Sequence, residues 1–374
     1  MNSRRRRILA LGKRCRMPSA DMHTGEIISA IERLDLGEIR LMEVCGTHTM
    51  SIAKSGLRSM LPKNIKLLSG PGCPVCVTPP EVIDAVLELA MEKDVIITTY
   101  GDMLRVPGST PGDSLQRRRA MGARVQMVYS PVDAVQLAKE NPDKQVVFLG
   151  VGFETTAPGT AAAALTAAEQ RVENFSLWSM LKTVEPALRA LMAMPDFNID
   201  GFICPGHVAT IIGVKGFRFL PEEYSMPAVI AGFEPEDILR AVYRLAKQIA
   251  EQSPKIENEY RRAVTENGNP LAQNMMNTCL RRRADNWRGL GLIPDSGLEP
   301  AAVLERLDAE KRFGISCVEK PKPTACRCGD VICGRIAPEQ CPMFGGRCTP
   351  EDPVGPCMVS SEGACAAAYK YAGV

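Results

Sequence analysis

The chain has 374 residues, of which 45% are hydrophobic, so it is long enough for two or three domains with apolar cores. Its formal net charge is +2, and only 5% of its residues are aromatic. Nucleic-acid-binding proteins usually carry a basic surface with stacking aromatic side chains, so this composition argues against nucleic acid as a partner. No apolar run approaches the roughly 18 residues that a membrane helix needs, so we expect no membrane segment.

The N-terminus is basic, with four arginines at residues 4–7 followed by the short apolar stretch 8–11. A secretory signal needs an apolar region of about 7–15 residues. We therefore expect residues 1–22 to form a disordered basic leader, and the protein to be cytoplasmic. Disulfides rarely persist in the cytoplasm, so the fourteen cysteines of the chain must have another role.

Apolar segments rich in β-branched residues alternate with helical patterns in the first part of the chain. Predicted strands cover residues 39–44, 65–68, 95–100 and 124–129, and helical patterns follow them. We expect residues 23–143 to form a first α/β domain.

The same pattern restarts in the next segment. Predicted strands cover residues 146–150, 201–204 and 228–232, and a helix is expected over residues 236–251. We expect residues 144–254 to form a second α/β domain.

Alternating helices and buried strands predict parallel sheets that are covered by helices on both faces. We therefore expect an α/β protein with two similar parallel-sheet lobes. In such folds the functional site lies beyond the carboxyl ends of the strands. Seven thiol or polar side chains fall in turns that follow predicted strands: Cys45, Cys73, Cys76, Asp102, Glu154, Cys204 and His207.

The sequence changes in character after the second domain. Charged segments at residues 256–265 and 271–283 predict helices, and residues 287–300 predict coil. A further helix is expected near residues 301–312. We therefore expect residues 255–374 to form a helical and cysteine-rich region.

Seven cysteines lie between Cys326 and Cys365, with no histidine among them. Thiolates are the soft ligands that hold iron–sulfur clusters. The irregular spacing lacks the paired CxxC elements of zinc knuckles, which favours a [4Fe–4S] cluster over structural zinc or inert cysteines. Only four cysteines can be ligands, and the spacing does not choose them. A set spread along the segment is Cys328, Cys341, Cys348 and Cys365, with Cys357 as the closest alternate.

Five segments resemble signature motifs of the HypD family of hydrogenase maturation proteins. They read EVCGTHT at residues 43–49, GPGCPVCVTP at 70–79, GFETTAP at 152–158, CPGHV at 204–208 and CMVSSEGAC at 357–365. The motifs are long and specific, and the resemblance covers roughly residues 24 to 372.

This resemblance implies a scaffold on which the Fe(CN)2CO unit of [NiFe] hydrogenases is assembled. It implies a small HypC-type chaperone that shares the iron, and a HypE-type cyanide donor with HypF upstream. The hydrogenase large subunit is then served indirectly. The fold implied is two α/β domains of similar topology and a C-terminal [4Fe–4S] region. Such a platform releases no free small-molecule product, so the sequence leaves open whether the protein is an enzyme.

Cys45 is the first candidate for the iron ligand. It stands where a predicted strand leads into a helix, and backbone N–H groups there favour a thiolate. The alternative is a small buried hydrophobe. His48 could face the same side and position the iron, donate a hydrogen bond to cyanide or move a proton. It could also simply bond to backbone.

Cys73 and Cys76 form a CxxC pair that can cycle between dithiol and disulfide and so store two electrons. We expect the terminal cluster to pass electrons to this pair one at a time. A zinc half-site is the alternative, although no second CxxC completes it.

Glu154, His207 and Asp102 are further candidates, because a carboxylate or imidazole near iron can orient ligands or transfer protons. Glu154 could instead cap a helix N-terminus. Cys204 is expected to be a core residue. Two rival functions remain: a thiol–disulfide oxidoreductase fed by the cluster, in which Cys45 would be dispensable, and a purely structural iron–sulfur or zinc scaffold.

Overall fold

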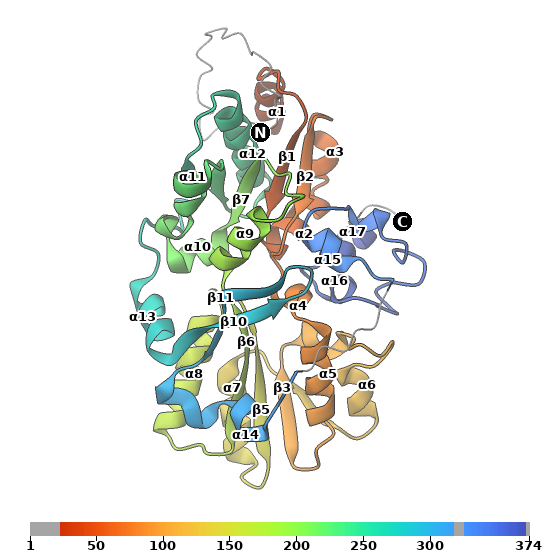
Figure 1. Ribbon diagram of the computed structural model, residues 1–374, viewed down its shortest axis with the longest axis vertical. Helices are drawn as coiled ribbons and strands as arrows, with labels where there is room; N and C mark the ends of the chain where they lie inside the picture. Colours follow the sequence, from red (N-terminus) through yellow and green to blue (C-terminus); the bar gives the residue numbers. More distant parts are fainter. Residues whose placement is uncertain (1–22, 318–324, 372–374) are drawn as a thin grey trace.

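The computed structural model describes residues 23–317 and 325–371. The predicted leader, residues 1–22, lies outside this part of the chain. Figure 1 shows two lobes, one above the other, with the blue C-terminal helices beside their junction. In the described part of the chain, no helix has both the length and the apolar character needed to cross a membrane.

The upper lobe is built on a parallel five-stranded sheet with the order β2-β1-β7-β8-β9. Its strands are β1 (Ile39–Glu43), β2 (Ile65–Ser69), β7 (Gly201–Pro205), β8 (Ala228–Ala231) and β9 (Ile256–Asn258). Two helices that are distant in sequence, α1 (Thr24–Glu32) and α12 (Pro235–Ala250), pack together on this sheet. Ile27, Leu41 and Val242 meet in the core between them.

The lower lobe is built on a six-stranded sheet with the order β10-β11-β6-β5-β3-β4. Its strands are β3 (Val95–Thr99), β4 (Arg124–Met127), β5 (Gln145–Gly152), β6 (Phe175–Lys182), β10 (Leu280–Trp287) and β11 (Gly291–Pro300). β3 to β6 are parallel, and β10 and β11 add an antiparallel hairpin. Every residue of β3 and β6 is buried, as expected for strands covered on both faces.

Helices on the two faces of the lower sheet account for this burial. On one face, α7 (Pro131–Glu140) and α8 (Ala157–Glu169) bury a core that includes Phe148. On the other face, α5 (Pro80–Leu89) packs through Val86.

The remaining helices are short. They are α2 (Gly46–Lys54), α3 (Leu57–Met60), α4 (Pro74–Val77), η1 (Gly101–Arg105), α6 (Leu115–Ala120), α9 (Val184–Met192), α10 (Gly206–Ile212), η2 (Val214–Phe217), α11 (Phe219–Tyr224), α13 (Pro270–Cys279), η3 (Ala302–Leu307), α14 (Ala309–Phe313), α15 (Cys328–Ile332), η4 (Pro338–Gln340), α16 (Pro356–Val359) and α17 (Ala364–Tyr371).

The two sheets share one strand order. The upper sheet contains β2-β1-β7-β8 and the lower sheet contains β4-β3-β5-β6, so in each the strand order is second, first, third, fourth. This confirms the prediction of two similar α/β lobes. The four parallel strands of the lower lobe lie in the chain between β2 and β7, so this part of the lower lobe is inserted in the upper one, and the chain returns to the lower sheet with β10 and β11 after β9. Each sheet therefore takes strands from both predicted domain ranges, 23–143 and 144–254, and a boundary at residue 143 does not separate the lobes.

The region after residue 254 is less helical than expected. The helix predicted over residues 271–283 ends at Cys279, where β10 begins, and the predicted coil over residues 287–300 is largely β11. The charged residues of β10 form a pattern that is typical of a helix. In the structure they form ion pairs across the hairpin instead, and Arg281 Nε lies 2.6 Å from Glu299 Oε1. Likewise the helix predicted from residue 256 is replaced by β9 at its start.

Candidate functional site

One cavity of about 580 Å³ lies where the carboxyl ends of strands from both sheets meet. Its walls come from the turns after β1, β2, β3, β4, β5 and β7 and from residues 360–362. The pairs β1/β7 and β3/β5 are neighbouring strands at which each sheet reverses its winding, which is where α/β folds place ligands. Among the predicted site residues, Cys45, His207 and Asp102 line this cavity.

Cys45 is the N-cap of α2 and is only 7% exposed. Its turn is fastened to the CxxC turn, because the Gly46 backbone N–H donates to the Gly72 carbonyl at 3.0 Å. A Cβ added at Gly72 would lie 2.2 Å from the backbone nitrogen of Cys45, so only glycine allows this approach. The two cysteine motifs therefore form one rigid wall.

Burial governs the chemistry of Cys45. Desolvation, and secondly the nearby carboxylate of Glu362, raise the pKa of this thiol to about 12. In the free protein, the effect of burial on this pKa is therefore larger than the expected stabilisation of the thiolate by the helix N-terminus. A metal bound at Cys45 would have to displace a proton.

Glu43, which was not among the predicted site residues, holds the Cys45 turn in place by hydrogen bonds. It is fully buried, accepts from the Cys45 backbone N–H at 3.0 Å and accepts from the Thr49 hydroxyl. Burial raises its pKa to about 7. The one available signal was its place at the start of the EVCGTHT motif.

His48 and His207 both stack on the ring of Phe233. The ring of His48 stacks on Phe233 with centroids 4.8 Å apart, and the ring of His207 stacks at 3.9 Å. His48 is fully buried, does not line the cavity, and places Nε2 2.9 Å from the Gly232 carbonyl oxygen. The structure therefore matches the alternative of a backbone-bonded histidine, while His207 reaches the cavity.

Desolvation lowers the pKa of both imidazoles, to about 4 for His48. Both rings are therefore neutral at neutral pH. A neutral His207 at the cavity wall can either donate or accept one hydrogen bond.

Glu154 does not line the cavity. It is 3% exposed, and Oε1 accepts from the backbone N–H of Val184, the first residue of α9, at 3.0 Å. Burial raises its pKa to about 7. Glu154 thus takes the predicted alternative role at a helix N-terminus, and its neighbours Thr155 and Thr156 line the cavity instead.

Cys73 and Cys76 form a disulfide in this structure, with Cα atoms 5.3 Å apart. Cys73 is the N-cap of α4, and its Sγ lies 3.4 Å from the hydroxyl oxygen of Ser360. The Ser360 hydroxyl donates to Asp102 Oδ2 at 3.0 Å. The pair therefore has the spacing for a reversible dithiol, and it touches the segment that carries the terminal cysteines.

Six of the seven terminal cysteines surround a small cavity of about 10 Å³: Cys326, Cys328, Cys341, Cys348, Cys357 and Cys365. The seventh, Cys333, directs its Sγ to the Gly289 carbonyl at 3.4 Å. All four predicted ligands are in the group of six, and the geometry does not choose among the six. No three histidine, cysteine, aspartate or glutamate side chains of residues 23–317 and 325–371 are arranged as a preformed metal site. The all-thiol donor set suits an iron–sulfur cluster, which would require these packed thiols to move apart.

Arg288, in the turn between β10 and β11, joins this cysteine group to the CxxC helix. Its backbone N–H donates to the Val77 carbonyl at 2.8 Å, and its guanidinium donates twice to the Thr78 carbonyl, at 3.1 and 2.9 Å. The pKa of Cys328 is well below its usual value, because Cys326 and Cys357 hydrogen-bond to it and Arg288 lies nearby. No sequence motif marks Arg288.

Residues 360–362 join the cysteine group to the cavity. Ser361 donates through its backbone N–H and its hydroxyl to Asp102 Oδ2, each at 3.0 Å. The Thr47 hydroxyl, two residues after Cys45, donates to Glu362 Oε1 at 2.9 Å. Residues 360–362, which lie between Cys357 and Cys365, thus contact both the Cys45 turn and the CxxC turn.

The family model HypD, described as the "Hydrogenase formation hypA family", matches residues 23–372. The hydrogenase maturation factor HypD of Escherichia coli K12 is 45% identical over 334 residues, which cover 89% of each chain. The HypD of Rhodobacter capsulatus is 45% identical over 342 residues and 90% of each chain. HypD2 of Bradyrhizobium diazoefficiens is 44% identical over 339 residues and 89% of each chain.

Proposed function

The chain belongs to the HypD family of hydrogenase maturation factors, and from this premise we propose that it is the scaffold on which the Fe(CN)2CO unit of [NiFe] hydrogenases is assembled. The iron unit is cargo that is held and then handed on. The observation that carries this proposal is the single cavity that brings Cys45 together with Asp102 and His207 at the junction of two sheets.

Cys45 is the proposed iron ligand. Its thiol must lose a proton when iron binds, because burial keeps it protonated in the free protein. The neutral imidazole of His207 lies on the same cavity wall and can accept that proton or hydrogen-bond to a cyanide nitrogen. Thr155 and Thr156 line the cavity from the lower lobe, and their hydroxyl groups can donate hydrogen bonds. Glu154 and His48 act as positioning residues in this proposal.

The terminal cysteines are the proposed site of a [4Fe–4S] cluster, held by four of the six thiols that converge. Such a cluster supplies electrons one at a time. The Cys73–Cys76 pair takes up two electrons and two protons when its disulfide opens to a dithiol. Arg288 and Ser360 hold the two sites in contact, and this contact supports an exchange of electrons between them.

A small HypC-type chaperone that shares the iron is the proposed partner, with a HypE-type protein as cyanide donor and HypF upstream. Tyr129, 85% exposed, and Met127, 40% exposed, stand where the cavity opens, and they offer an apolar contact for such a chaperone. The proposed location is the cytoplasm, where free thiols persist.

Infrared spectroscopy on anaerobically purified protein, co-expressed with its chaperone, tests the scaffold role. We expect two cyanide bands and one carbonyl band, and their loss in Cys45→Ala. Cys279→Ala is the control, because Cys279 is also a buried cysteine and lies outside the cavity. Bands that persist in Cys45→Ala would overturn the assignment of the iron ligand.

A second candidate is a thiol–disulfide oxidoreductase, favoured by the Cys73–Cys76 pair and its contact with the cysteine group. This function needs neither Cys45 nor a chaperone. An absence of cyanide and carbonyl bands, together with disulfide reduction that Cys45→Ala leaves intact, would support it instead.

A further inference from the structure

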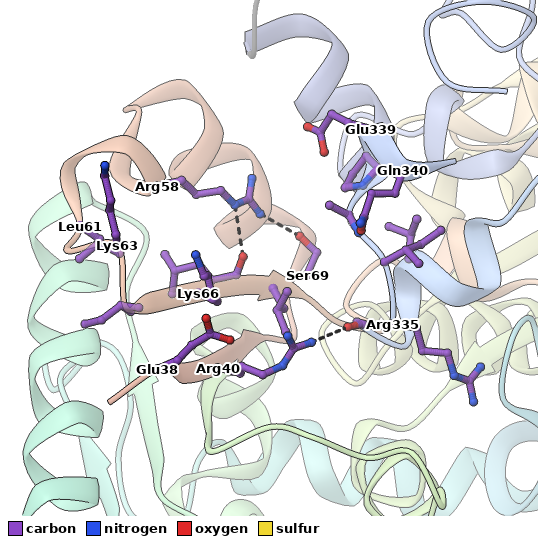
Figure 2. Close-up of a pocket in the computed structure, with 18 of the residues that line it drawn as sticks. Glu38, Arg40, Arg58, Leu61, Lys63, Lys66, Ser69, Arg335, Glu339 and Gln340 are labelled. Atoms are coloured by element: carbon purple, nitrogen blue, oxygen red, sulfur yellow. Dashed lines mark hydrogen bonds between the residues drawn. The ribbon is translucent and has the colours of Figure 1, made fainter. Parts of the chain in front are cut away.

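A second hollow, of about 750 Å³, runs along the upper sheet and has no lining residue in common with the Cys45 cavity. One wall is formed by β2 and α3, and the other by residues 334–340 of the C-terminal region. Figure 2 shows Arg58, Lys63 and Lys66 on one side and Glu339 and Gln340 on the other. We call this hollow the β2 groove.

β2 is an outer strand of its sheet. Its pairing with β1 uses alternate residues, since the Ile39 N–H donates to the Asn64 carbonyl and the Gly70 N–H donates to the Glu43 carbonyl. The backbone groups of Ile65, Leu67 and Ser69 therefore point away from β1, to the free edge. An unpaired edge of this kind is a template for another strand.

Part of this edge is occupied by the chain itself. The Ile65 N–H donates to the Pro62 carbonyl, and Arg58 Nε reaches the Leu67 carbonyl at a long 3.4 Å. Beyond these contacts, the outward N–H groups of Leu67 and Ser69 have no partner among the described residues. Leu67 and Ser69 are 8% and 9% exposed, so an incoming backbone reaches these N–H groups by displacing the side chain of Arg58.

The groove carries a local excess of positive charge. Arg40, Arg58, Lys63 and Lys66 line it, and none of them lies in ion-pair distance of a described carboxylate. Arg335 also lines it but turns to Asp196, at 2.5 Å. Two carboxylates, Glu38 and Glu339, also line the groove. Four cations that form no ion pair with them still leave an excess of positive charge beside the edge of β2, and this excess favours an acidic occupant.

We propose that the β2 groove binds an extended, acidic segment of a partner protein, which adds a strand to the outer edge of β2. Main-chain hydrogen bonds to Leu67 and Ser69 supply the register, and Lys63, Lys66 and Arg58 pair with acidic side chains. Leu61 and Ile336 offer apolar contacts on the two walls. β2 has five residues, so the segment needs about five residues, or some 17 Å of extended chain.

This groove is connected to the Cys45 turn. Arg58 donates to the Ser69 hydroxyl at 3.3 Å, and Ser69 hydrogen-bonds to Glu43, the carboxyl that holds the backbone N–H of Cys45. An acidic side chain of the bound segment that attracts Arg58 would therefore disturb the series of hydrogen bonds that runs from Arg58 through Ser69 and Glu43 to the Cys45 backbone. The inference does not depend on what Cys45 binds.

The probe is a short fluorescein-labelled peptide in which glutamate alternates with valine, titrated against the full chain and followed by fluorescence anisotropy. We expect saturable binding that weakens roughly tenfold in the double variant Lys63→Glu, Lys66→Glu, because two attractions become repulsions. Both lysines are exposed, so the variant should fold. Lys215→Glu, an exposed lysine outside the groove, is the matched control and should bind as the parent does.

Two further measurements separate strand addition from charge attraction alone. A central proline in the peptide should abolish binding, since proline cannot donate to a strand ladder. Hydrogen exchange at the amides of Leu67 and Ser69 should slow when the peptide binds.

Unchanged exchange, or equal binding by the double variant, would overturn the proposal. So would full displacement of the peptide by inorganic phosphate, which would make the groove a small-anion site. Self-association of the free chain that the double variant abolishes would instead make it a contact between copies. Cyanide and carbonyl bands test the Cys45 cavity separately, so either idea can fail alone.

Discussion

The two lobes share one strand order but differ in the chemistry that they bring to the cavity. The upper lobe contributes Cys45, after β1, and His207, after β7. The lower lobe contributes Asp102, after β3, and the hydroxyls of Thr155 and Thr156, after β5. Topology therefore fixes where side chains meet, and the turns alone decide which chemistry is placed there.

Burial shifts the buried ionisable groups of the two lobes according to the charge that each group would carry. In the upper lobe it lowers the pKa of His48 to about 4 and raises the pKa of Glu43 to about 7, and in the lower lobe it raises the pKa of Glu154 to about 7. The contributions of His48 and Glu154 to stability should therefore depend on pH in opposite directions. Five substitutions test how far the comparison of the two lobes holds.

Gly72→Ala should have the largest effect. Its Cβ would meet backbone atoms of Val44 and Cys45 at 2.2 to 2.5 Å, which cannot move without breaking the turn. We expect a loss of about 3 kcal/mol or more in the free energy of unfolding, measured by urea denaturation. In the lower lobe, the Cβ of Gly152→Ala would meet the side chain of Thr156, at 1.6 Å from Oγ1 and 2.8 Å from Cβ. Rotation of Thr156 relieves the first contact and not the second, so this variant should also lose stability, but less than Gly72→Ala.

Gly159→Ala is the control, because nothing lies within 4 Å of its Cβ and it lies inside α8. Alanine should stabilise the helix there by about 0.5–1 kcal/mol. If Gly72→Ala and Gly152→Ala lowered the free energy of unfolding equally, the turn after β2 and the end of β5 would tolerate an added Cβ equally well.

His48→Gln should remove a contribution to the free energy of unfolding that the parent protein loses in acid. The folded-state pKa, about 4, is below the unfolded value of 6.5, so the unfolded chain binds the proton more readily. The stability due to neutral His48 is complete above pH 6.5 and is lost as pH falls toward 4. Relative to the variant, the parent should lose up to about 3 kcal/mol over that interval in urea unfolding.

Glu154→Gln should show the opposite sign in the lower lobe. The folded-state pKa, about 7, is above the unfolded value of 4.5, so the folded protein retains the proton. The contribution is complete below pH 4.5 and is lost as pH rises through 7. Relative to the variant, the parent should lose up to about 3 kcal/mol from pH 4.5 to 8. A flat difference would mean that Glu154 is ionised when folded.

Asp102→Ala should have the smallest effect, because its partners lie near the surface. It removes the acceptor for the hydroxyls of Ser360 and Ser361 and for the Ser361 backbone N–H. We expect faster hydrogen exchange over residues 357–365 and a local loss of about 1–2 kcal/mol. Asp113→Ala, which breaks the half-buried ion pair with Arg118 at a distance from that segment, should leave residues 357–365 unchanged.

Much of the strand pattern could be predicted, because apolar β-branched runs and glycine-rich turns are local signals. β6 escaped prediction, since its run FSLWSMLK has no alternation and every residue is buried. The insertion of one lobe in the other also escaped, because it rests on pairs such as Leu41 with Gly201 that no local pattern encodes. Strand order in space is a property of the whole core.

The residues of the site likewise divide into those that a local motif marks and those that only the folded structure brings together. Cys45 and His207 stand in turns that follow predicted strands, and the structure brings both to one cavity. The contact of Phe233 with two histidines could not be foreseen, since it depends on ring stacking across distant turns. Arg288 is likewise visible only once the hairpin is folded.

The insertion of the lower lobe has a consequence for the order in which the protein can form during synthesis. About 160 residues separate β1 from its partner β7 in the chain, and their synthesis takes roughly 8 to 30 s at ordinary elongation rates. Throughout that time an apolar strand edge stays open, whereas the four parallel strands of the lower lobe can already pair. The cavity itself needs residues 360–362, which are synthesised after every strand of both sheets. Loading of any cargo there must therefore follow synthesis of residue 362, because a shorter nascent chain has no finished cavity to fill.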